Sequence, residues 1–230
     1  MWTLLAALAF SSAASAGVPE DVETAADTNL PTHLRQQAFD RVAQPGATDA
    51  LTALAKDPNT PKQERWVAIR ALGPIGDDPS RVALLQFLAA DDAPTRMAAL
   101  GAIGDRKDPS LSGYAAARLS DPALLVRASA AEALGKLKDP STLPDLERAL
   151  KDPTNHYRGT SLWLRRHLVD AMGAIGTDAA VPGLARALDD ADPQVVAAAI
   201  AGLEKIAGFS YKEGRTPDQE REAWRRWAGR

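Results

Sequence analysis

The residues best suited to bind a charged ligand lie between Thr154 and Val169. This stretch contains three arginines and two histidines and no acidic residue. Arginine offers forked donors that match carboxylate and phosphate groups. The stretch also lengthens an otherwise regular pattern, and functional variation concentrates in such loops. We predict a binding patch for an acidic peptide, a carboxylate or a phosphate. Its residues are His156, Tyr157, Arg158, Arg166, His167 and Asp170. The alternative is a longer helix with ordinary surface charge.

A tryptophan supplies a second candidate for recognition. Trp66 falls at a solvent-facing helix position where related stretches have Ala128 and Ala197. An exposed tryptophan in a concavity is a common anchor for a partner. Arg70 follows four residues later, on the same helix face. We therefore add Trp66 and Arg70 to the predicted binding residues. The alternative is that Trp66 packs against a neighbouring helix.

Catalytic and metal-binding motifs are not found in the sequence. His156 and His167 are 167 − 156 = 11 residues apart, about three helical turns, which is too far to share an ion. His33 stands alone, and there is no cysteine. There is no Gly-x-Ser-x-Gly and no glycine-rich phosphate loop. We predict a non-enzymatic protein without catalytic residues, metal or cofactor.

These side chains must be positioned by helices, because a helical motif recurs along the chain. The motif is Ala-Leu-Gly-x-Ile-Gly with looser copies, and its anchors are Phe39, Leu72, Leu100, Leu134, Met172 and Leu203. They are spaced by 33, 28, 34, 38 and 31 residues. Such spacing is typical of a solenoid of helical hairpins, in which each unit buries its apolar stripe against its neighbours.

Proline, aspartate and glycine mark the ends of these helices. Asp-Pro pairs begin the second helix of a unit, because Asp caps free amides and Pro suits the first helical position. The pairs start at Asp57, Asp121, Asp152 and Asp192. Pro144 and Pro182 begin first helices in the same way. The repeated glycines are interpreted as helix stops.

The pattern Asp-Pro…Val-Arg-x-x-Ala-Ala-x-Ala-Leu-Gly at residues 121–135 resembles bacterial HEAT repeats, most closely the phycobilisome-lyase subtype. The resemblance covers about residues 30–208 and implies an all-α fold. We expect an α-solenoid, a right-handed superhelix of about five to six hairpins. It also implies a ladder of Arg65, Arg127 and Arg165, with Asp121, Asp152 and Asp192 as partners. In the last unit Val196 replaces the ladder arginine. In two other units the arginines, Arg35 and Arg96, are predicted to lie one helical turn after the ladder position.

The amino terminus has the pattern of an export signal. An apolar run at residues 2–10 is followed by small residues with an Ala-x-Ala cleavage pattern ending at Ala16. We predict a signal peptide at 1–16, a flexible lead-in at 17–29 and the repeat array at 30–208. A loop and capping helix follow at 209–230, in which Trp224 and Trp227 cover the end of the stack. The mature chain is then periplasmic or secreted and has no transmembrane segment.

The net charge of −3, with both signs interspersed, argues against nucleic-acid binding. The best-supported function is an exported scaffold or adaptor that binds a protein or peptide partner on its concave face. We expect it to be monomeric. Acidic partners suit the basic patch. The alternatives are a bilin-lyase-like enzyme, which only the repeat subtype implies, and a purely structural spacer.

Overall fold

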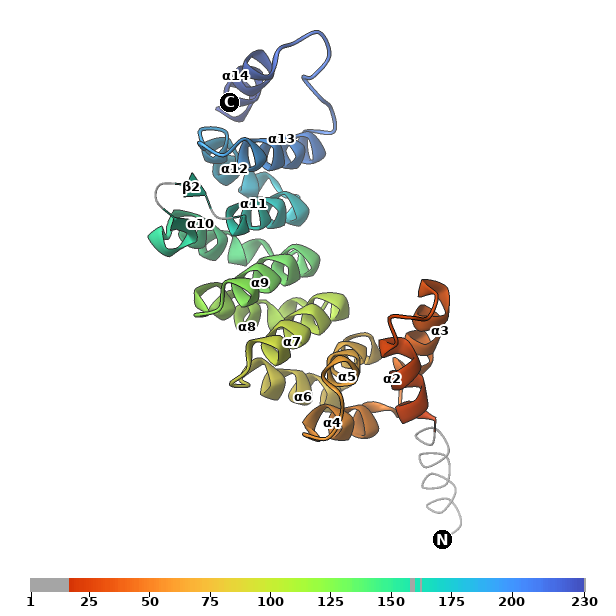
Figure 1. Cartoon of the computed structure of the whole chain (residues 1–230). Helices are drawn as coiled ribbons and strands as arrows, with labels where there is room; N and C mark the ends of the chain where they lie inside the picture. Colours follow the sequence, from red (N-terminus) through yellow and green to blue (C-terminus); the bar gives the residue numbers. More distant parts are fainter. Residues whose placement is uncertain (1–16, 158–159, 162, 230) are drawn as a thin grey trace. The chain divides into compact units, whose positions relative to one another are not determined.

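The computed structural model of the chain describes residues 17–157, 160–161 and 163–229. The predicted signal peptide and Arg158 therefore lie outside the described residues. The described chain is almost entirely helical, which confirms the predicted fold class (Figure 1). It divides into two compact units between Arg106 and Lys107. Each unit is considered by itself below.

The described part of the first unit, from residue 17 onward, holds three helix pairs. The helices are α2 (Val18–Ala26) with α3 (Thr32–Val42), α4 (Thr48–Lys56) with α5 (Lys62–Ile75), and α6 (Asp78–Leu88) with α7 (Ala93–Arg106). The members of each pair pack on each other, and α5 also packs on α7. The second helices α5 and α7 therefore lie side by side, whereas the first pair meets α5 mainly through α2.

The second unit repeats this plan and adds a terminal helix. Its pairs are α8 (Ser112–Ala117) with α9 (Leu124–Leu137), α10 (Leu143–Lys151) with α11 (Leu164–Ile175), and α12 (Val181–Ala187) with α13 (Pro193–Ala207); α14 (Pro217–Ala228) follows. Short 3-10 turns are η1 (Pro109–Leu111), η2 (Arg118–Ser120), η3 (Pro140–Thr142), η4 (Pro153–Asn155) and η5 (Asp178–Ala180). A small hairpin, β1 (His156–Tyr157) and β2 (Thr160–Ser161), occupies the insertion. Here α11 packs on both α9 and α13.

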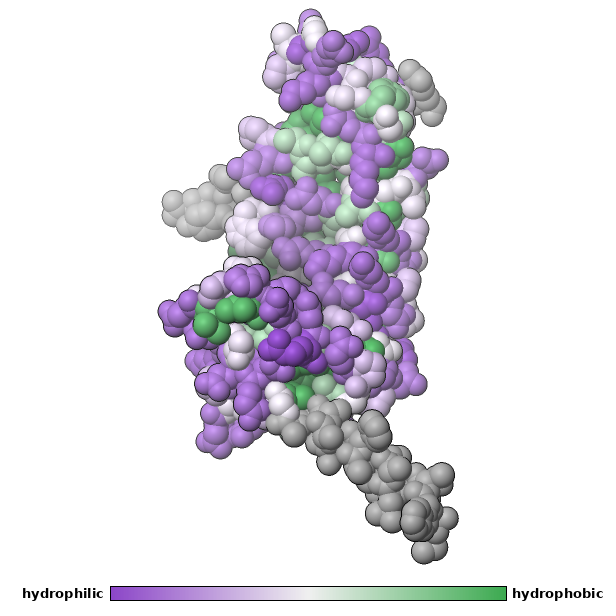
Figure 2. Space-filling model, turned by 90° about the vertical axis from the view of Figure 1, so that its right-hand side faces the viewer, coloured by the Kyte–Doolittle hydropathy of each residue, from purple (hydrophilic) through white to green (hydrophobic). Residues whose placement is uncertain are grey.

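Leucine and alanine fill the core, as the repeat predicts. Leu72, Leu134 and Met172 are fully buried anchors. Small alanines beside them, such as Ala68 and Ala130, let the helices approach closely. Polar side chains cover most of the face drawn in Figure 2. Within the described part of the chain, no helix is both long and apolar enough to cross a membrane.

The helix boundaries correct the repeat register. An arginine is the fourth residue of four successive second helices: Arg35 in α3, Arg65 in α5, Arg96 in α7 and Arg127 in α9. The prediction that Arg35 and Arg96 lie one turn late was therefore wrong. The true anchors, seven residues after each arginine, include Val42 and Ile103 in place of Phe39 and Leu100. Their spacings become 72 − 42 = 30, 103 − 72 = 31, 134 − 103 = 31, 172 − 134 = 38 and 203 − 172 = 31.

Two of these arginines, Arg96 and Arg127, hold the loops before their own helices. Arg96 donates to the carbonyls of Ala90 and Asp91 at 2.9 and 2.7 Å, and Arg127 donates to that of Asp121 at 2.8 Å. Arg165 instead pairs with Asp190 of the next helix pair at 2.6 Å, with side-chain exposures of 12% and 6%. Asp190, rather than the predicted Asp192, is therefore the carboxylate partner. Asp192 caps α13 by accepting from the Gln194 amide.

Two kinds of glycine occur in the repeated motif. Gly76, Gly176 and Gly208 end helices in the left-handed conformation, as predicted. Gly73 and Gly173 instead lie inside helices. A Cβ added at Gly173 would stand 2.8 Å from the Gly202 Cα, closer than real Cβ contacts. The interpretation of every repeated glycine as a helix stop was therefore wrong, because glycines such as Gly73 and Gly173 lie inside helices and allow neighbouring helices to touch.

The segment predicted as a flexible lead-in is a packed helix. Val18, Val22 and Ala25 of α2 are buried against α3 and α5. Their spacing of four and three residues places them on one helix face. Asp21 on the other side pairs with Arg41 of α3, with Nε and Oδ1 2.9 Å apart. In the sequence, the acidic residues between these three positions obscure the apolar pattern of the helix.

The carboxyl-terminal helix is held by an aromatic cluster. Trp224 is fully buried, and its ring stacks on Phe209 and meets Tyr211 and Trp227 edge-on. α14 packs on α12 and α13. At its start, a capping box pairs Thr216 with Gln219.

Candidate functional site

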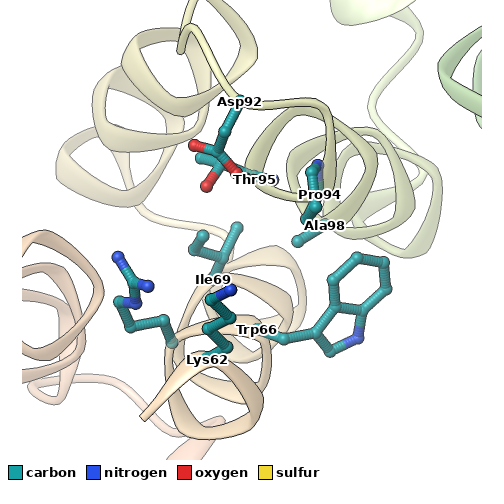
Figure 3. Close-up of a pocket in the computed structure, with 8 residues that line it drawn as sticks. Lys62, Trp66, Ile69, Asp92, Pro94, Thr95 and Ala98 are labelled. Carbon is teal, nitrogen blue, oxygen red and sulfur yellow. Dashed lines mark hydrogen bonds between the residues drawn. The ribbon is translucent and has the colours of Figure 1, made fainter. Parts of the chain in front are cut away.

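A groove between α5 and α7 is a candidate site that contains one of the predicted binding residues. It encloses about 340 Å³ and is here called the Trp66 groove. Its lining residues are Lys62, Arg65, Trp66 and Ile69 from α5, with Asp92, Pro94, Thr95 and Ala98 from α7 and the loop before it (Figure 3). The α5 residues are the first, fourth, fifth and eighth of that helix, so successive turns place them along one side.

Trp66 forms one end of this groove and remains open to solvent. Its side chain lies beside Ala98, on the side of the groove away from Asp92 (Figure 3). The residue is 38% exposed, so a large apolar surface is available for contact. Ile69 forms a buried floor between the two helices. An aromatic edge over an apolar floor is the arrangement that anchors partner side chains.

The charges of the groove do not cancel. Burial would raise the pKa of the Asp92 carboxyl, but hydrogen bonds from Thr95 and the attraction of Arg65 hold that pKa below its ordinary value. The Thr95 amide donates to Asp92 Oδ1 at 2.9 Å. The positive charge of Arg65 and the negative charge of Asp92 thus offset each other. Lys62 has no ion pair or side-chain hydrogen bond among the described residues and leaves one uncompensated positive charge.

Arg70 is committed to a structural contact. Its guanidinium pairs with Asp105 of α7, and both side chains are about one-quarter exposed. It also fills the space over Gly101, where an added Cβ would collide with it. Arg70 therefore joins α5 to α7 below the groove and does not present free donors.

The members of the predicted basic patch are engaged in local pairs. Arg166 and Asp170 pair with each other on α11 at 3.3 Å. His167 Nδ1 lies 3.4 Å from Glu132 Oε1 of α9, and its ring meets Trp163 edge-on, with centroids 4.8 Å apart. Trp163 is 42% exposed and does not pack inward. The partners of His167 were not among the predicted site residues.

The insertion borders a hollow of about 330 Å³, but ion pairs line it. His156 stands at its edge, with Nδ1 3.4 Å from the Asp152 carbonyl oxygen. Arg165 pairs with Asp190, and Arg186 pairs with Glu147. Tyr157 lies in β1, and Arg158 lies outside the described residues. The described part of the insertion therefore offers few free cations to an anionic ligand.

The structure separates the predicted site residues into two groups. Trp66 and Arg70 belong to the first unit, whereas His156, Tyr157, Arg166, His167 and Asp170 belong to the second. Among the described residues, no group of three or more His, Cys, Asp or Glu side chains is placed to hold a metal ion.

The repeats match known patterns. HEAT repeats match residues 81–164, and PBS lyase HEAT-like repeats match residues 64–90 and 164–190. The chain contains HEAT repeats. The phycobilisome-lyase resemblance is thereby confirmed at the level of the repeat.

Solved repeat proteins share this HEAT-type fold. Kap121p has a TM-score of 0.53 at 13% identity, covering 83% of this chain and 25% of its own. An engineered protein has a TM-score of 0.52 at 17% identity, covering 86% and 92%. These similarities confirm the α-solenoid prediction. Human deoxyhypusine hydroxylase in complex with glycerol has a TM-score of 0.48 at 18% identity, covering 86% and 98%.

A curated relative corrects the prediction about catalysis. Deoxyhypusine hydroxylase of Candida albicans (strain SC5314 / ATCC MYA-2876) is 26% identical over 156 residues. The match includes 68% of this chain but only 38% of the relative, so the chain spans well under half of that protein. The expectation of a non-enzymatic protein is contradicted, because this relative is an enzyme. Repeat periodicity could not reveal this, since it reports only the scaffold.

Proposed function

We propose that this HEAT-repeat chain binds an extended segment of a protein or peptide partner in the Trp66 groove. The observation that carries the proposal is a half-exposed tryptophan at the end of a groove with a buried apolar floor. Concave layers of second helices are the usual binding surfaces of such arrays. An apolar partner side chain would cover Ile69 and contact the Trp66 ring.

The charge of the groove favours an acidic partner segment. Lys62 supplies the uncompensated positive charge, while Arg65 and Asp92 offset each other. A carboxylate next to the apolar anchor would pair with Lys62 at the rim. Such a rim pair adds mainly to selectivity, because exposed ion pairs contribute only about 0–1 kcal/mol.

Two exposed tryptophans give a matched test. Trp66→Ala should weaken binding of an acidic, leucine-containing peptide about tenfold or more, as loss of an interface anchor does. Trp163→Ala removes a similarly exposed tryptophan from the second unit and should leave the affinity unchanged. Titration calorimetry measures both, and thermal unfolding checks that each variant folds. Equal affinities for Trp66→Ala and the parent would refute the proposal.

A second candidate function is catalytic and comes from the curated relative. The 26% identity favours a hydroxylase-type reaction on a deoxyhypusine-bearing protein. No residue of this chain is assigned to that reaction. Incubation with such a substrate followed by mass spectrometry tests it, with the gain of one oxygen atom as the positive result. A lyase activity rests on the repeat subtype alone and is tested by transfer of bilin to an acceptor protein.

We also propose export to the periplasm of a bacterial cell, or secretion. The support is the Ala-x-Ala pattern ending at Ala16. Helix α2 begins at Val18, so cleavage after Ala16 would leave all the helices that the structure describes intact. Amino-terminal sequencing of protein recovered from a bacterial envelope fraction tests this, with Gly17 expected as the first residue. An intact Met1 in that fraction would contradict it.

A further inference from the structure

A second groove lies in the other unit, between α13 and α14. It also encloses about 340 Å³ and is here called the α13–α14 groove. Its lining residues are Asp190, Ala191, Pro193, Val196, Ala197 and Ile200 on one side, and Pro217, Asp218, Glu220 and Arg221 on the other. None of the predicted binding residues lies here.

The groove occupies the same place in its repeat as the Trp66 groove. Both use the first, fourth, fifth and eighth residues of a second helix. The offset between them is constant, since 193 − 62, 196 − 65, 197 − 66 and 200 − 69 all equal 131. At these places α13 has proline, valine, alanine and isoleucine. The floor is therefore wholly apolar and lacks an aromatic end. Figure 2 shows apolar surface exposed at the level of α13 and α14 on the face drawn.

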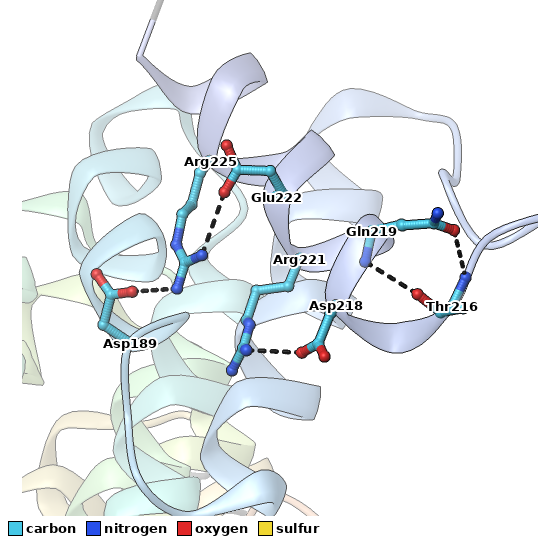
Figure 4. A network of polar contacts seen from close by, with 7 residues as sticks. All are labelled: Asp189, Thr216, Asp218, Gln219, Arg221, Glu222 and Arg225. Carbon is cyan, nitrogen blue, oxygen red and sulfur yellow. Dashed lines mark hydrogen bonds and ion pairs between the residues drawn. The ribbon is translucent and has the colours of Figure 1, made fainter.

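The rim of the α13–α14 groove is acidic. Asp218 pairs with Arg221 at 2.7 Å on the first turns of α14 (Figure 4). The Asp190 carboxylate forms an ion pair with Arg165. Arg225, one turn further along α14, is held by Asp189 and Glu222 and does not line the groove. Glu220 has no ion pair or side-chain hydrogen bond within the described part of the chain. One uncompensated negative charge thus stands over the apolar floor.

We propose that this groove binds a partner segment in which a lysine or arginine lies next to an aliphatic residue. The aliphatic side chain covers Ala197 and Ile200, and the alkyl stem of the basic residue lies along the same floor. Long cationic side chains bury their stems in this way and keep the charge at the rim. The charged end then meets Glu220, and an acidic segment is repelled by the same carboxylate.

The probe is a pair of short capped peptides that differ only in charge, one alternating leucine with lysine and the other leucine with glutamate. The lysine peptide should bind the full chain, and Glu220→Lys should weaken it about tenfold, which equals about 1.4 kcal/mol. Glu213→Lys makes the same change of net charge in an exposed loop outside the groove and should have little effect. Calorimetry at low and moderate salt measures both.

Making the floor polar gives a test that does not depend on charge. Ile200→Ser replaces an apolar side chain of the floor with a polar one and should weaken binding of the lysine peptide about tenfold, whereas Lys62→Glu in the other unit should not weaken it. The proposal is wrong if Glu220→Lys and Ile200→Ser leave the affinity unchanged while circular dichroism shows folded protein. It is equally wrong if the glutamate peptide binds here as tightly as the lysine peptide. Trp66→Ala affects only the acidic peptide, so failure at one groove is distinguishable from failure at the other.

Discussion

The Trp66 groove and the α13–α14 groove are the same feature built twice with different side chains. Each opens along the first two turns of a second helix and has about the same volume. The first carries Arg65 and Trp66 where the second carries Val196 and Ala197. The uncompensated charge is that of Lys62 in one and of Glu220 in the other. A repeated backbone thus provides sites of opposite preference, and the side chains of two helical turns decide which ligand each accepts.

The walls of the two grooves are also held in different ways. α5 meets α7 through a close backbone contact, at Gly73 against Ala102. α14 is instead anchored by the ring of Trp224 among Phe209 and Tyr211. Backbone contact tolerates no added atom, whereas an aromatic cluster depends on one large side chain. Each groove is therefore sensitive to a different kind of substitution.

The largest effect is expected from removing the aromatic anchor. Trp224→Ala deletes a fully buried ring, and such truncations cost about 3–5 kcal/mol. α14 has few other contacts, so it should detach and destroy the α13–α14 groove. Hydrogen exchange should show lost protection in residues 217–228, with loss of lysine-peptide binding. Retained binding of the acidic peptide in the Trp66 groove is the internal control. Unchanged protection of α14 would show that the cluster does not anchor it.

Closing the helix contact in the first unit should have the next largest effect. A Cβ at Gly73 would lie 3.0 Å from the carbonyl carbon and Cα of Ala102, so α5 and α7 must separate. Gly73→Ala is expected to lower the unfolding free energy by about 1–3 kcal/mol, as overpacking does. Gly113→Ala, on α8, has nothing within 4 Å of its new Cβ and serves as the control. Chemical denaturation compares the two, and equal stability would rule out the close contact.

Exchanging side chains between the grooves tests the comparison directly. The double variant Val196→Arg with Ala197→Trp gives the α13–α14 groove the two residues of the Trp66 groove. Its affinity for the lysine peptide should fall about tenfold, since an arginine at position 196 offsets the charge of Glu220. Stability should change by only about ±0.5 kcal/mol, because neither position is buried. Unaltered peptide preference would mean that these two turns do not determine selectivity.

Much of the fold follows from sequence periodicity, because each hairpin must bury an apolar stripe against its neighbours. The predicted alignment of the repeats was wrong in α7, because two neighbouring segments there fit the motif. They are Ala99-Leu100-Gly101 and Ala102-Ile103-Gly104. Only the helix start at Ala93 shows that the second is equivalent to Leu72 and Leu134. Helix α2 was missed because three apolar residues among acidic ones gave a weak signal.

The candidate site was only partly visible in the sequence. Trp66 stood out because two equivalent helix positions, 128 and 197, hold alanine. The pair Arg166–Asp170 is four residues apart and could have been anticipated on a helix. The pair Arg70–Asp105 depends on how α5 stacks on α7, which spacing alone does not show. The α13–α14 groove contains no unusual residue, so only the three-dimensional arrangement of the two helices reveals it.

The smallest expected effect concerns the charge balance of the Trp66 groove. Asp92→Asn removes the carboxylate that offsets Arg65 but keeps a residue able to cap α7. The acidic peptide should then bind a few-fold more tightly, because one opposing negative charge is gone. The same substitution changes the pH dependence of stability. The folded-state pKa of Asp92 lies below its ordinary value of 3.8, so its stabilisation is present above that pH and is lost as pH falls through the folded-state pKa.

Asp152→Asn separates these two effects. Hydrogen bonds from Thr154 lower the pKa of Asp152 despite its partial burial, and the attraction of Arg127 adds to this. Both variants should therefore flatten the acid limb of the stability curve below about pH 4 in denaturation experiments. Only Asp92→Asn should tighten acidic-peptide binding, because Asp152 lies in the second unit and lines no part of the Trp66 groove. Equal tightening by both would indicate a general charge effect and would remove Asp92 from the selectivity of the groove.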